Sequence, residues 1–344
     1  MEEVSFSMKK FYSKILFFFF GLIVGFLIFE FNWNQNNLFL TGNVSLSQEA
    51  LKEKKVKITA VGDVMLNRGV EFMVEKFGGN DWHFPFSKIK EDFEDSDIIF
   101  ANLEGPLSDK GERAGSIYSF RFSPESMEAL NYLGFNILSL ANNHVFDYGR
   151  EAFLDTLNRL EEAGISYLGA GRNREEAFSL RIKEVNGIKI GFLGYTNLGT
   201  SHWQAKSNSA GIAWINYYSL ENVKNYIEDI RKEVDLLIIS LHTGIEYSKV
   251  ITDFQEKFSK GCIDSGADIV IGHHPHIIQK MERYKGGWIA YSLGNFVFDQ
   301  GFSEETMEGL VLEITLTKKG ENKSLEVIPK KVKINQFFQP EFNE

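Results

Sequence analysis

A short stretch of the chain gathers several reactive side chains directly after an apolar run. In "SLANNHVFDYG" (139–149), two asparagines, His144 and Asp147 follow "FNILSL" (135–140). The apolar run is typical of a buried strand, and Asn-Asn alone would make the turn after it. The added histidine and aspartate indicate either a well-capped loop or a reactive site at the C-terminal end of a strand.

Other apolar segments end in side chains of the same kinds. The candidates at these predicted strand ends are Asp63, Asn102, Glu104, Asn142, Asn143, His144, His242, His273, His274 and His276. Ligands of open α/β sheets bind beyond the carboxyl ends of the strands, so we expect these side chains to converge on one site.

Together, the candidate side chains have the chemistry of a metal centre. Carboxylate, amide and imidazole groups are ligands of divalent Zn, Mn, Fe or Mg ions. One or two such ions can bind a phosphate ester and share a hydroxide nucleophile. A histidine that is not a ligand can then protonate the leaving group.

Several candidates also have simpler explanations. Asp63 could cap a helix, and Glu104 could be a turn carboxylate before Gly105-Pro106. His242 could be a hydrogen-bonded core histidine. "GHHPH" (272–276) is harder to explain in this way, because burying so many neighbouring histidines is unusual without an ion. We therefore expect metal or phosphate binding at this segment.

Strand and helix patterns alternate along the chain from Val56 onward. Runs of strand type are "VKITAVGD" (56–63), "SDIIFANLEG" (96–105), "DLLIISLH" (235–242) and "DIVIGHHPH" (268–276). Helical patterns include "EAFLDTLNRLEEAG" (151–164) and "LENVKNYIEDIRKEV" (220–234). Asn186-Gly187 predicts a hairpin turn. This order predicts an α/β fold with a mixed sheet or two stacked sheets.

The N-terminal segment has the pattern of a membrane anchor. Lys9, Lys10 and Lys14 precede an apolar run over 15–29, and aromatic residues extend that run to the length of a bilayer span. The lysines predict a cytoplasmic N-terminus and a main domain outside the cell membrane, in a single-pass topology. A cleaved signal peptide is the alternative.

These patterns divide the chain into five segments. They are a cytoplasmic N-terminus (1–10), a transmembrane anchor (11–33), a linker (34–54), the main domain (55–335) and a C-terminal tail (336–344).

Charge and cysteine content exclude some classes of protein. The formal net charge of −10 argues against nucleic acid as a partner, which would require a basic surface. An anionic substrate would need local positive charge from a metal or from arginines such as Arg68 and Arg121. The single cysteine, Cys262, rules out an intramolecular disulfide and a thiolate zinc cluster, and we interpret it as a buried helix residue.

A resemblance to a known family covers roughly residues 56–300. The ordered segments "VGDVML", "ANLEGPLS", "LANNHVFDYG", "SLHTGIEY", "IGHHPH" and "YSLGNFVFD" resemble the poly-γ-glutamate capsule biosynthesis proteins of the CapA (PgsA) family. That family belongs to the calcineurin-like metallophosphoesterase superfamily. The resemblance implies an α/β/β/α sandwich of two mixed sheets flanked by helices, which holds one or two divalent metal ions.

The resemblance also implies roles for individual residues. His144 matches the general acid, and Asp147 would orient it or line the pocket. Asn102 and His273 are further candidates for metal or substrate, and the His-x-His spacing favours His274 and His276 over His273. The implied metal ligands are Asp63, Glu104 as the bridging carboxylate, Asn143, His242, His274 and His276.

The same motifs also suggest which residues line the rim of the site, and they show one position at which this chain differs from the superfamily. Asn295 and Asp299, in "SLGNFVFD", are expected with Arg68 and Arg121 at the substrate-binding rim. The superfamily's first motif is Asp-x-His, whereas this chain has Met65 in the third position. One strong and one weak metal site are therefore expected.

The implied function is a membrane-anchored, extracytoplasmic metallophosphoesterase-like protein of poly-γ-glutamate synthesis or export. Its partners would be the membrane, other subunits of a capsule polymer synthase, and an anionic polymer or phosphoester substrate. An alternative is a non-catalytic scaffold that binds metal and polymer within a synthase. A weaker alternative is an exported 5′-nucleotidase-like phosphatase, for which little chain remains after residue 300.

Overall fold

The computed structural model describes residues 52–114 and 117–342 of the chain. The elements that position the candidate site belong to one compact unit of residues 54–318 and 323–344. The predicted anchor (11–33), the segment before it and most of the predicted linker (34–54) lie outside the described residues. Within the described ranges, no helix is both long enough and apolar enough to cross a membrane.

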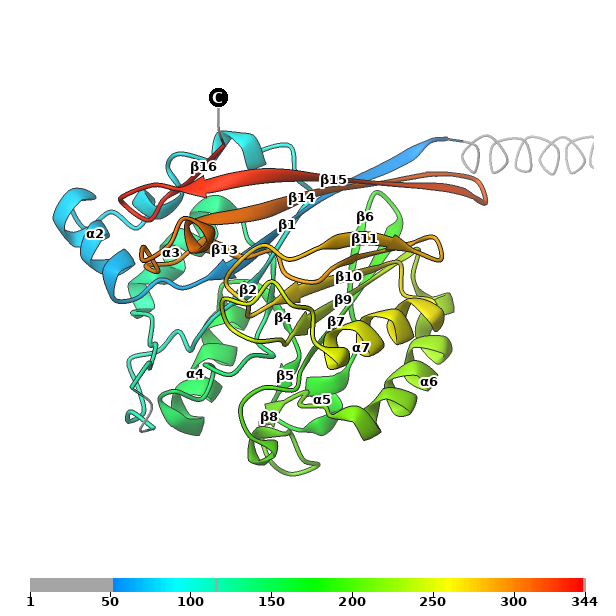
Figure 1. The fold of residues 1–344 in the computed structure, drawn as a ribbon, viewed down its shortest axis with the longest axis horizontal. Coiled ribbons are helices and arrows are strands. Elements are labelled where there is room, and N and C mark those ends of the chain that lie inside the picture. Colours follow the sequence, from blue (N-terminus) through cyan, green and yellow to red (C-terminus); the bar gives the residue numbers. More distant parts are fainter. Residues whose placement is uncertain (1–51, 115–116, 343–344) are drawn as a thin grey trace, which may run out of the picture. The chain divides into compact units, whose positions relative to one another are not determined.

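Two mixed sheets form the centre of this unit (Figure 1). The larger sheet has the order β16-β15-β14-β1-β2-β3-β4, with β13 paired to β1, and the smaller has the order β11-β12-β10-β9-β7-β6. The strands of the larger sheet are β1 (Lys54–Val64), β2 (Ile98–Leu103), β3 (Ile137–Ser139), β4 (Ser166–Leu168), β13 (Asn295–Val297), β14 (Glu308–Lys319), β15 (Asn322–Ile334) and β16 (Pro340–Phe342). Those of the smaller are β6 (Arg181–Val185), β7 (Ile188–Thr196), β9 (Leu236–His242), β10 (Ile269–His273), β11 (Met281–Tyr284) and β12 (Gly287–Ala290). A separate pair joins β5 (Ala170–Gly171) to β8 (Gly211–Ile212).

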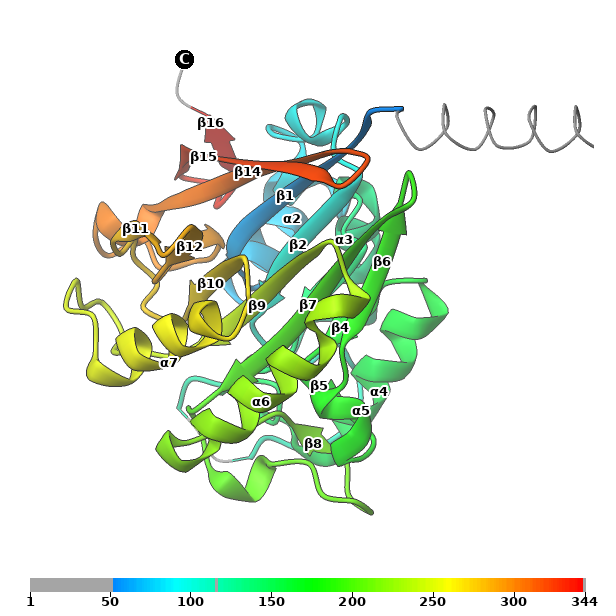
Figure 2. The same cartoon turned by 90° about the vertical axis from the view of Figure 1, so that its right-hand side faces the viewer.

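Helices cover the outer face of each sheet (Figure 2). Those packed on the larger sheet are α2 (Gly69–Phe77), α3 (Met127–Leu133) and α4 (Gly149–Glu162). Those packed on the smaller sheet are α6 (Leu220–Ile230) and α7 (Asp253–Asp264), and the short α5 (Arg174–Phe178) lies beside β5 and β8. Cys262 of α7 is fully buried in this outer layer, as its sequence context predicts.

The alternation of side chains along β1 explains the layers. Val56, Ile58 and Ala60 lie in the core between the two sheets, where they share one cluster with residues of β7 and β9 such as Phe192 and Ile238. The neighbouring positions point to the opposite face, toward the helices. A strand buried on both faces reads as an almost continuous apolar run. The layers are helix, sheet, sheet and helix, and the mixed α/β prediction is confirmed.

Parallel pairing aligns the strand ends that carry the candidate side chains. β2 lies parallel to β1 and β3, and β9 lies parallel to β7 and β10. Asp63 stands opposite Asn102 on one side and Asn295 on the other, and His242 stands opposite His273. The carboxyl ends of these strands therefore meet at common edges.

A glycine allows β13 to approach β1 at this edge. A Cβ atom on Gly62 would lie 2.0 Å from the carbonyl oxygen of Gly294, so only glycine fits there. The next residue, Asp63, donates its backbone N–H to that carbonyl at 3.0 Å. The close approach brings Asp63 and Asn295 into register.

Two further predictions concern the turns and the C-terminal segment. The hairpin at Asn186-Gly187 is confirmed: both residues have positive φ, 54° and 71°, and they join antiparallel β6 and β7. Residues 340–342 lie in the predicted tail (336–344), but they form β16, which pairs with β15 through Val332 and Phe342. No local pattern in the sequence predicts that pairing.

Candidate metal centre

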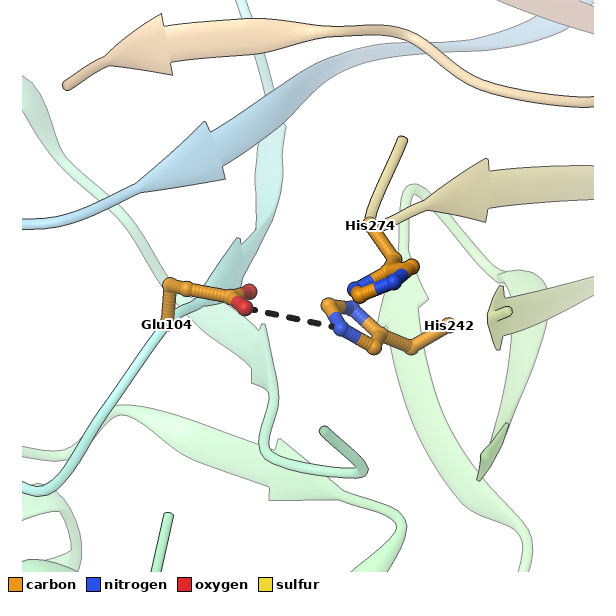
Figure 3. A group of neighbouring side chains, drawn as sticks. All are labelled: Glu104, His242 and His274. Carbon is orange, nitrogen blue, oxygen red and sulfur yellow. Dashed lines mark ion pairs between the residues drawn. The ribbon is translucent and has the colours of Figure 1, made fainter. Parts of the chain in front are cut away.

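The carboxyl ends of the two sheets bring the candidate ligands together. From the larger sheet come Asp63, Asn102 and Glu104, followed by the 142–147 loop after β3. From the smaller sheet come the histidines at the ends of β9 and β10. Figure 3 shows Glu104, His242 and His274 pointing toward one another, with Glu104 Oε1 3.5 Å from His242 Nε2. These three side chains can each offer one ligand atom within 4.8 Å of the others.

Asparagine side chains hold the carboxylates in place. Asn102 Nδ2 donates to Asp63 Oδ1 at 2.8 Å and also to Glu104 Oε2. Asn142 Nδ2 in turn donates to Asn102 Oδ1 at 3.0 Å and to the carbonyl of Leu103 at 2.8 Å. The two carboxylates are therefore oriented before any ligand binds. Asn142 was recognised in the sequence only as part of a strand end, and its supporting role depends on the fold.

Burial and neighbouring groups shift the pKa values of the two carboxylates in opposite directions. Burial alone would raise the pKa of Asp63, but contacts with His273 and His276 outweigh it and hold that pKa well below its usual value. Burial, followed by the charge on Asp63, raises the pKa of Glu104 well above its usual value, against the hydrogen bond from Asn102. A divalent cation bound next to the two carboxylates would supply positive charge. With that charge present, both carboxylates could be ionised at the same time.

The histidines present neutral nitrogen atoms to the same space. His242 and His274 are 0% and 6% exposed. Burial lowers the pKa of His242 well below its usual value and lowers that of His274 to about 3. Neutral imidazole is the form of histidine that binds metal ions. His242 Nε2 also lies 2.8 Å from Asn143 Oδ1, which places the predicted amide ligand next to it.

Several buried atoms of this group have no hydrogen-bond partner. They are Glu104 Oε1, His242 Nδ1, His274 Nδ1 and His273 Nε2, while His273 Nδ1 has only a 3.3 Å contact with Asp63. A buried polar atom without a partner is rare and costs about 1–3 kcal/mol. Their clustering around ligand-type atoms fits a divalent metal ion, and the residues present suit such an ion.

His273 and His276 lie on the Asp63 side of the cluster. Each places its Nδ1 3.3 Å from an oxygen of Asp63. His276 Nδ1 also lies 3.0 Å from Asn295 Oδ1, whereas the His273 ring packs at 5.9 Å from that of Phe100. The structure brings all the histidines of "GHHPH" to the site, and the preference for His274 and His276 as ligands stays a prediction.

His144 and Asp147 form a hydrogen-bonded pair at the edge of the cluster. His144 Nδ1 lies 2.8 Å from Asp147 Oδ2, which also accepts the backbone N–H of Phe120 at 2.8 Å. His144 Nε2 lies 3.9 Å from Glu104 Oε1. With Asp147 as acceptor, Nδ1 carries a proton and Nε2 faces the carboxylate and the metal ligands.

The sequence matches the family described as "Bacterial capsule synthesis protein PGA_cap" over residues 57–300. The chain belongs to this family. It is 34% identical to the capsule biosynthesis protein CapA of Bacillus anthracis over 283 residues, covering 81% of this chain and 68% of that protein. It is 33% identical to the PGA biosynthesis protein CapA of Bacillus subtilis (strain 168) over 272 residues, covering 78% of this chain and 70% of that protein. The resemblance seen in the sequence motifs is confirmed.

A solved structure shares the fold of this PGA_cap chain. It is a putative 5′-nucleotidase from Staphylococcus aureus in complex with alpha-ketoglutarate. The likeness has a TM-score of 0.50 at 17% sequence identity, and covers 85% of this chain and 55% of that one. At this identity the likeness concerns the fold alone.

The predicted rim residues of the PGA_cap chain divide into two kinds. Arg68 forms an ion pair with Asp299, with Nε 3.1 Å from Oδ2, and its guanidinium lies 4.7 Å from the ring centre of Phe120. Phe120 in turn packs against His144, at 4.2 Å between ring centres. Arg68 and Asp299 therefore stand beside the His144 pair, and their role at a substrate-binding rim stays a prediction.

Arg121 and Asn295 have structural partners. Arg121 Nη1 donates to the carbonyls of Lys110 and Gly111, at 3.3 Å each, and its guanidinium lies 4.1 Å from the ring centre of Tyr148. Asn295 donates to the carbonyl of Thr306 at 2.9 Å and contacts His276. Asn295 thus orients a histidine, a role closer to the metal ligands than the predicted rim.

The third position of the first aspartate motif, Met65, offers no nitrogen ligand in the folded protein. Met65 is fully buried, and its Sδ accepts the backbone N–H of Asn67 at 3.2 Å. A carboxylate that the sequence motifs did not single out, Glu246, comes close to His274 and His276 instead. Its position in "SLHTGIEY", four residues after His242, was the only signal available in the sequence.

Proposed function

We propose that this protein is a metal-dependent phosphoesterase that acts in the synthesis or export of poly-γ-glutamate or a related anionic capsule polymer. Membership of the PGA_cap family supports the link to the capsule. One observation carries the chemical part: buried, unpartnered ligand atoms of Glu104, His242 and His274 lie beside the His144–Asp147 pair.

The ligand set suits a transition metal or Mg-like ion. Glu104, His242 and His274 would hold one ion, with Asn143 and Asp63 in adjoining positions. When bound, a divalent ion polarises a phosphoryl oxygen and lowers the pKa of water. Asn102 keeps both carboxylates aimed at that space.

His144 is placed to act as the general acid. Asp147 accepts from Nδ1, so the proton available for transfer sits on Nε2, which faces Glu104. Nε2 can then deliver this proton to the oxygen that leaves phosphorus. General acid catalysis of this kind contributes typically about 10²–10⁴-fold in rate.

The cellular setting is part of the proposal. The lysines before the apolar run at 15–29 favour a single-pass anchor in the cell membrane with the catalytic domain outside the cytoplasm. A synthase in the cell membrane would make the polymer, and this chain would be one subunit of that synthase.

The test uses the full chain in detergent. Bound transition metals are quantified, and hydrolysis of a phosphodiester and a phosphomonoester is measured with added Mn²⁺. We expect bound metal and turnover, with His144→Ala reducing kcat by about 10²–10⁴-fold while the metal content is retained. Turnover that is unchanged in His144→Ala would contradict the assigned role of His144.

A non-catalytic scaffold is the second candidate function. Met65, fully buried where the superfamily has a histidine ligand, favours it because a weakened metal position would impair two-metal chemistry. When a measurement of poly-γ-glutamate binding is added to that experiment, bound metal and bound polymer without turnover on either ester would establish the scaffold and overturn the enzyme.

A 5′-nucleotidase activity is the weakest candidate. The shared fold with a putative 5′-nucleotidase concerns architecture only. The described residues from 308 to 342 form β14, β15 and β16, which belong to the larger sheet of the same unit and do not form a second, substrate-binding domain. Adding a nucleoside monophosphate to the substrates tests it, since a nucleotidase would prefer this ester over the others.

A further inference from the structure

A chain of side-chain hydrogen bonds runs from a histidine of the metal centre to a partly exposed tyrosine. His276 Nδ1 lies 3.0 Å from Asn295 Oδ1, and Asn295 Nδ2 donates to Gln300 Oε1 at 3.0 Å. Gln300 Nε2 in turn donates to the hydroxyl of Tyr247 at 3.0 Å. The first three side chains are buried, whereas Tyr247 is 43% exposed. The hydrogen bonds therefore link the interior of the site to its open side.

A backbone carbonyl fixes the direction of these hydrogen bonds. Asn295 Nδ2 also donates to the carbonyl of Thr306 at 2.9 Å, and a carbonyl oxygen can only accept. Asn295 must therefore present its oxygen to His276, and Gln300 must present its nitrogen to Tyr247. The tyrosine hydroxyl thus accepts from Gln300, so it can donate its own proton to another group.

The backbone and the ring of Tyr247 are both held beside the histidine segment. Its φ of 60° is an outlier for a bulky residue, and such conformations persist where the surrounding structure enforces them. Its N–H donates to the carbonyl of Pro275 at 2.8 Å. Its ring centre lies 6.0 Å from that of His276 and 5.1 Å from that of Phe302. Burial, followed by the charge of Glu246, raises the pKa of Tyr247 to about 12, so the hydroxyl keeps its proton at neutral pH.

The segment that positions this hydroxyl also positions an arginine. Asp299, the neighbour of Gln300 in the chain, forms an ion pair with Arg68. The Arg68 guanidinium lies 4.7 Å from the ring centre of Phe120, which packs against His144. Two adjacent residues thus hold a guanidinium on the His144 side of the site and a phenol on the side of the histidine segment.

We propose that Tyr247 is a substrate-binding residue whose hydroxyl donates to a phosphoryl oxygen at the metal centre, and that Gln300 is its positioning residue. This inference rests on the proposed function and names a contact to the substrate. A hydrogen bond to an ionised acceptor is about twice as strong as one between neutral groups, so a phenol that is free to donate favours an anionic oxygen. Because Gln300 occupies the accepting side of the hydroxyl, the contact selects an acceptor over a donor.

The test measures binding of inorganic phosphate to the Mn²⁺-loaded full chain in detergent, by titration calorimetry. Tyr247→Phe removes only the hydroxyl, and Gln300→Met removes the hydrogen bond but keeps a side chain of similar length. The double variant shows whether both residues act through one contact. Tyr218→Phe is the control, because Tyr218 is 91% exposed in the short helix Tyr217–Ser219 outside the site. Mn²⁺ affinity, ester turnover and binding of a γ-linked glutamate oligomer are recorded separately.

We expect Tyr247→Phe to weaken phosphate binding about 10-fold, as for a lost hydrogen bond to a charged group, and to leave the Mn²⁺ affinity unchanged. Gln300→Met should weaken phosphate binding less, and the double variant should match Tyr247→Phe. Additive losses in the double variant would overturn the role of Gln300.

Three results would overturn the contact of Tyr247 with phosphate. They are phosphate binding that is absent from the wild type or unchanged in Tyr247→Phe, a parallel loss of Mn²⁺ affinity, and a loss of binding confined to the glutamate oligomer. Weakened phosphate binding in a chain without turnover would sustain the contact and overturn the enzyme.

Discussion

Two groups of histidine and carboxylate in this molecule have similar composition and opposite surroundings. In the metal centre, Glu104 and His242 are fully buried and His274 is nearly so. On the surface, His83 lies between Asp81 and Glu128, at 3.5 Å from Nδ1 and 3.4 Å from Nε2. The surface side chains are 43%, 57% and 58% exposed in that order.

The difference lies in how each group satisfies its polar atoms. Both nitrogens of His83 face a carboxylate, its ring stacks on Tyr132 at 4.0 Å, and water can solvate the remaining oxygens. The buried group has unpartnered atoms and two carboxylates whose pKa values are shifted in opposite directions. Similar residue types therefore indicate a metal site only where burial removes water as the alternative partner.

The largest expected effect is the gain in the free energy of unfolding on metal binding, which should depend on the buried group and not on the surface group. At a Mn²⁺ concentration 100 times the wild-type Kd, bound metal should raise the free energy of unfolding by about 2.7 kcal/mol. Glu104→Gln should abolish this gain, whereas Glu128→Gln should keep it, as measured by thermal unfolding with Mn²⁺ and with EDTA. Glu104→Gln should fold well without metal, because the raised pKa of Glu104 favours its neutral form. A gain in Glu104→Gln equal to that of the wild type would refute the assignment.

A smaller effect is expected from residues that only support the histidines. Asn295 orients His276 through a 3.0 Å contact, and Tyr132 stacks on His83. Loss of such a supporting contact to a metal ligand typically costs about 10–100-fold in metal affinity. We therefore expect Asn295→Ala to weaken Mn²⁺ binding to this extent in a calorimetric titration, with Tyr132→Ala as the unaffected control. Equal Kd values for both variants would show that His276 is not a ligand.

The smallest expected effect, taken per pH unit, is on the pH dependence of stability in the presence of EDTA. The pKa of His274 is lowered to about 3 in the folded protein, against a usual value of 6.5. Between these values the unfolded chain binds the proton and the folded chain does not, so stability falls as pH drops from about 6.5 toward 3. The loss is at most about 1.4 kcal/mol per pH unit.

His274→Asn should therefore show a shallower loss of stability in urea unfolding at pH 4–7. A His274→Asn slope identical to that of the wild type would show that the buried imidazole is not the group that titrates.

Local patterns in the sequence determined the elements and the types of ligand. Apolar runs stopped by polar residues predicted β1, β2, β3, β9 and β10, and Asn186-Gly187 predicted the β6–β7 turn. These features are readable because strand periodicity and turn chemistry depend on near neighbours in the chain. The same motifs carried the family resemblance, which the family match over residues 57–300 confirms.

Only the tertiary structure decided which side chains share a space. Pairing between strands far apart in the sequence joined Asp63 to Asn102 and Asn295, and opposed Glu104 to His242 across the two sheets. It also turned Arg121 toward backbone carbonyls, brought Glu246 to the histidines and added β16 to the sheet. Burial and contacts at long sequence separation set these outcomes, and no local pattern encodes them. The sequence by itself therefore determined which ligands are available, and packing of the two sheets decided which of them are buried without partners and fit a metal ion.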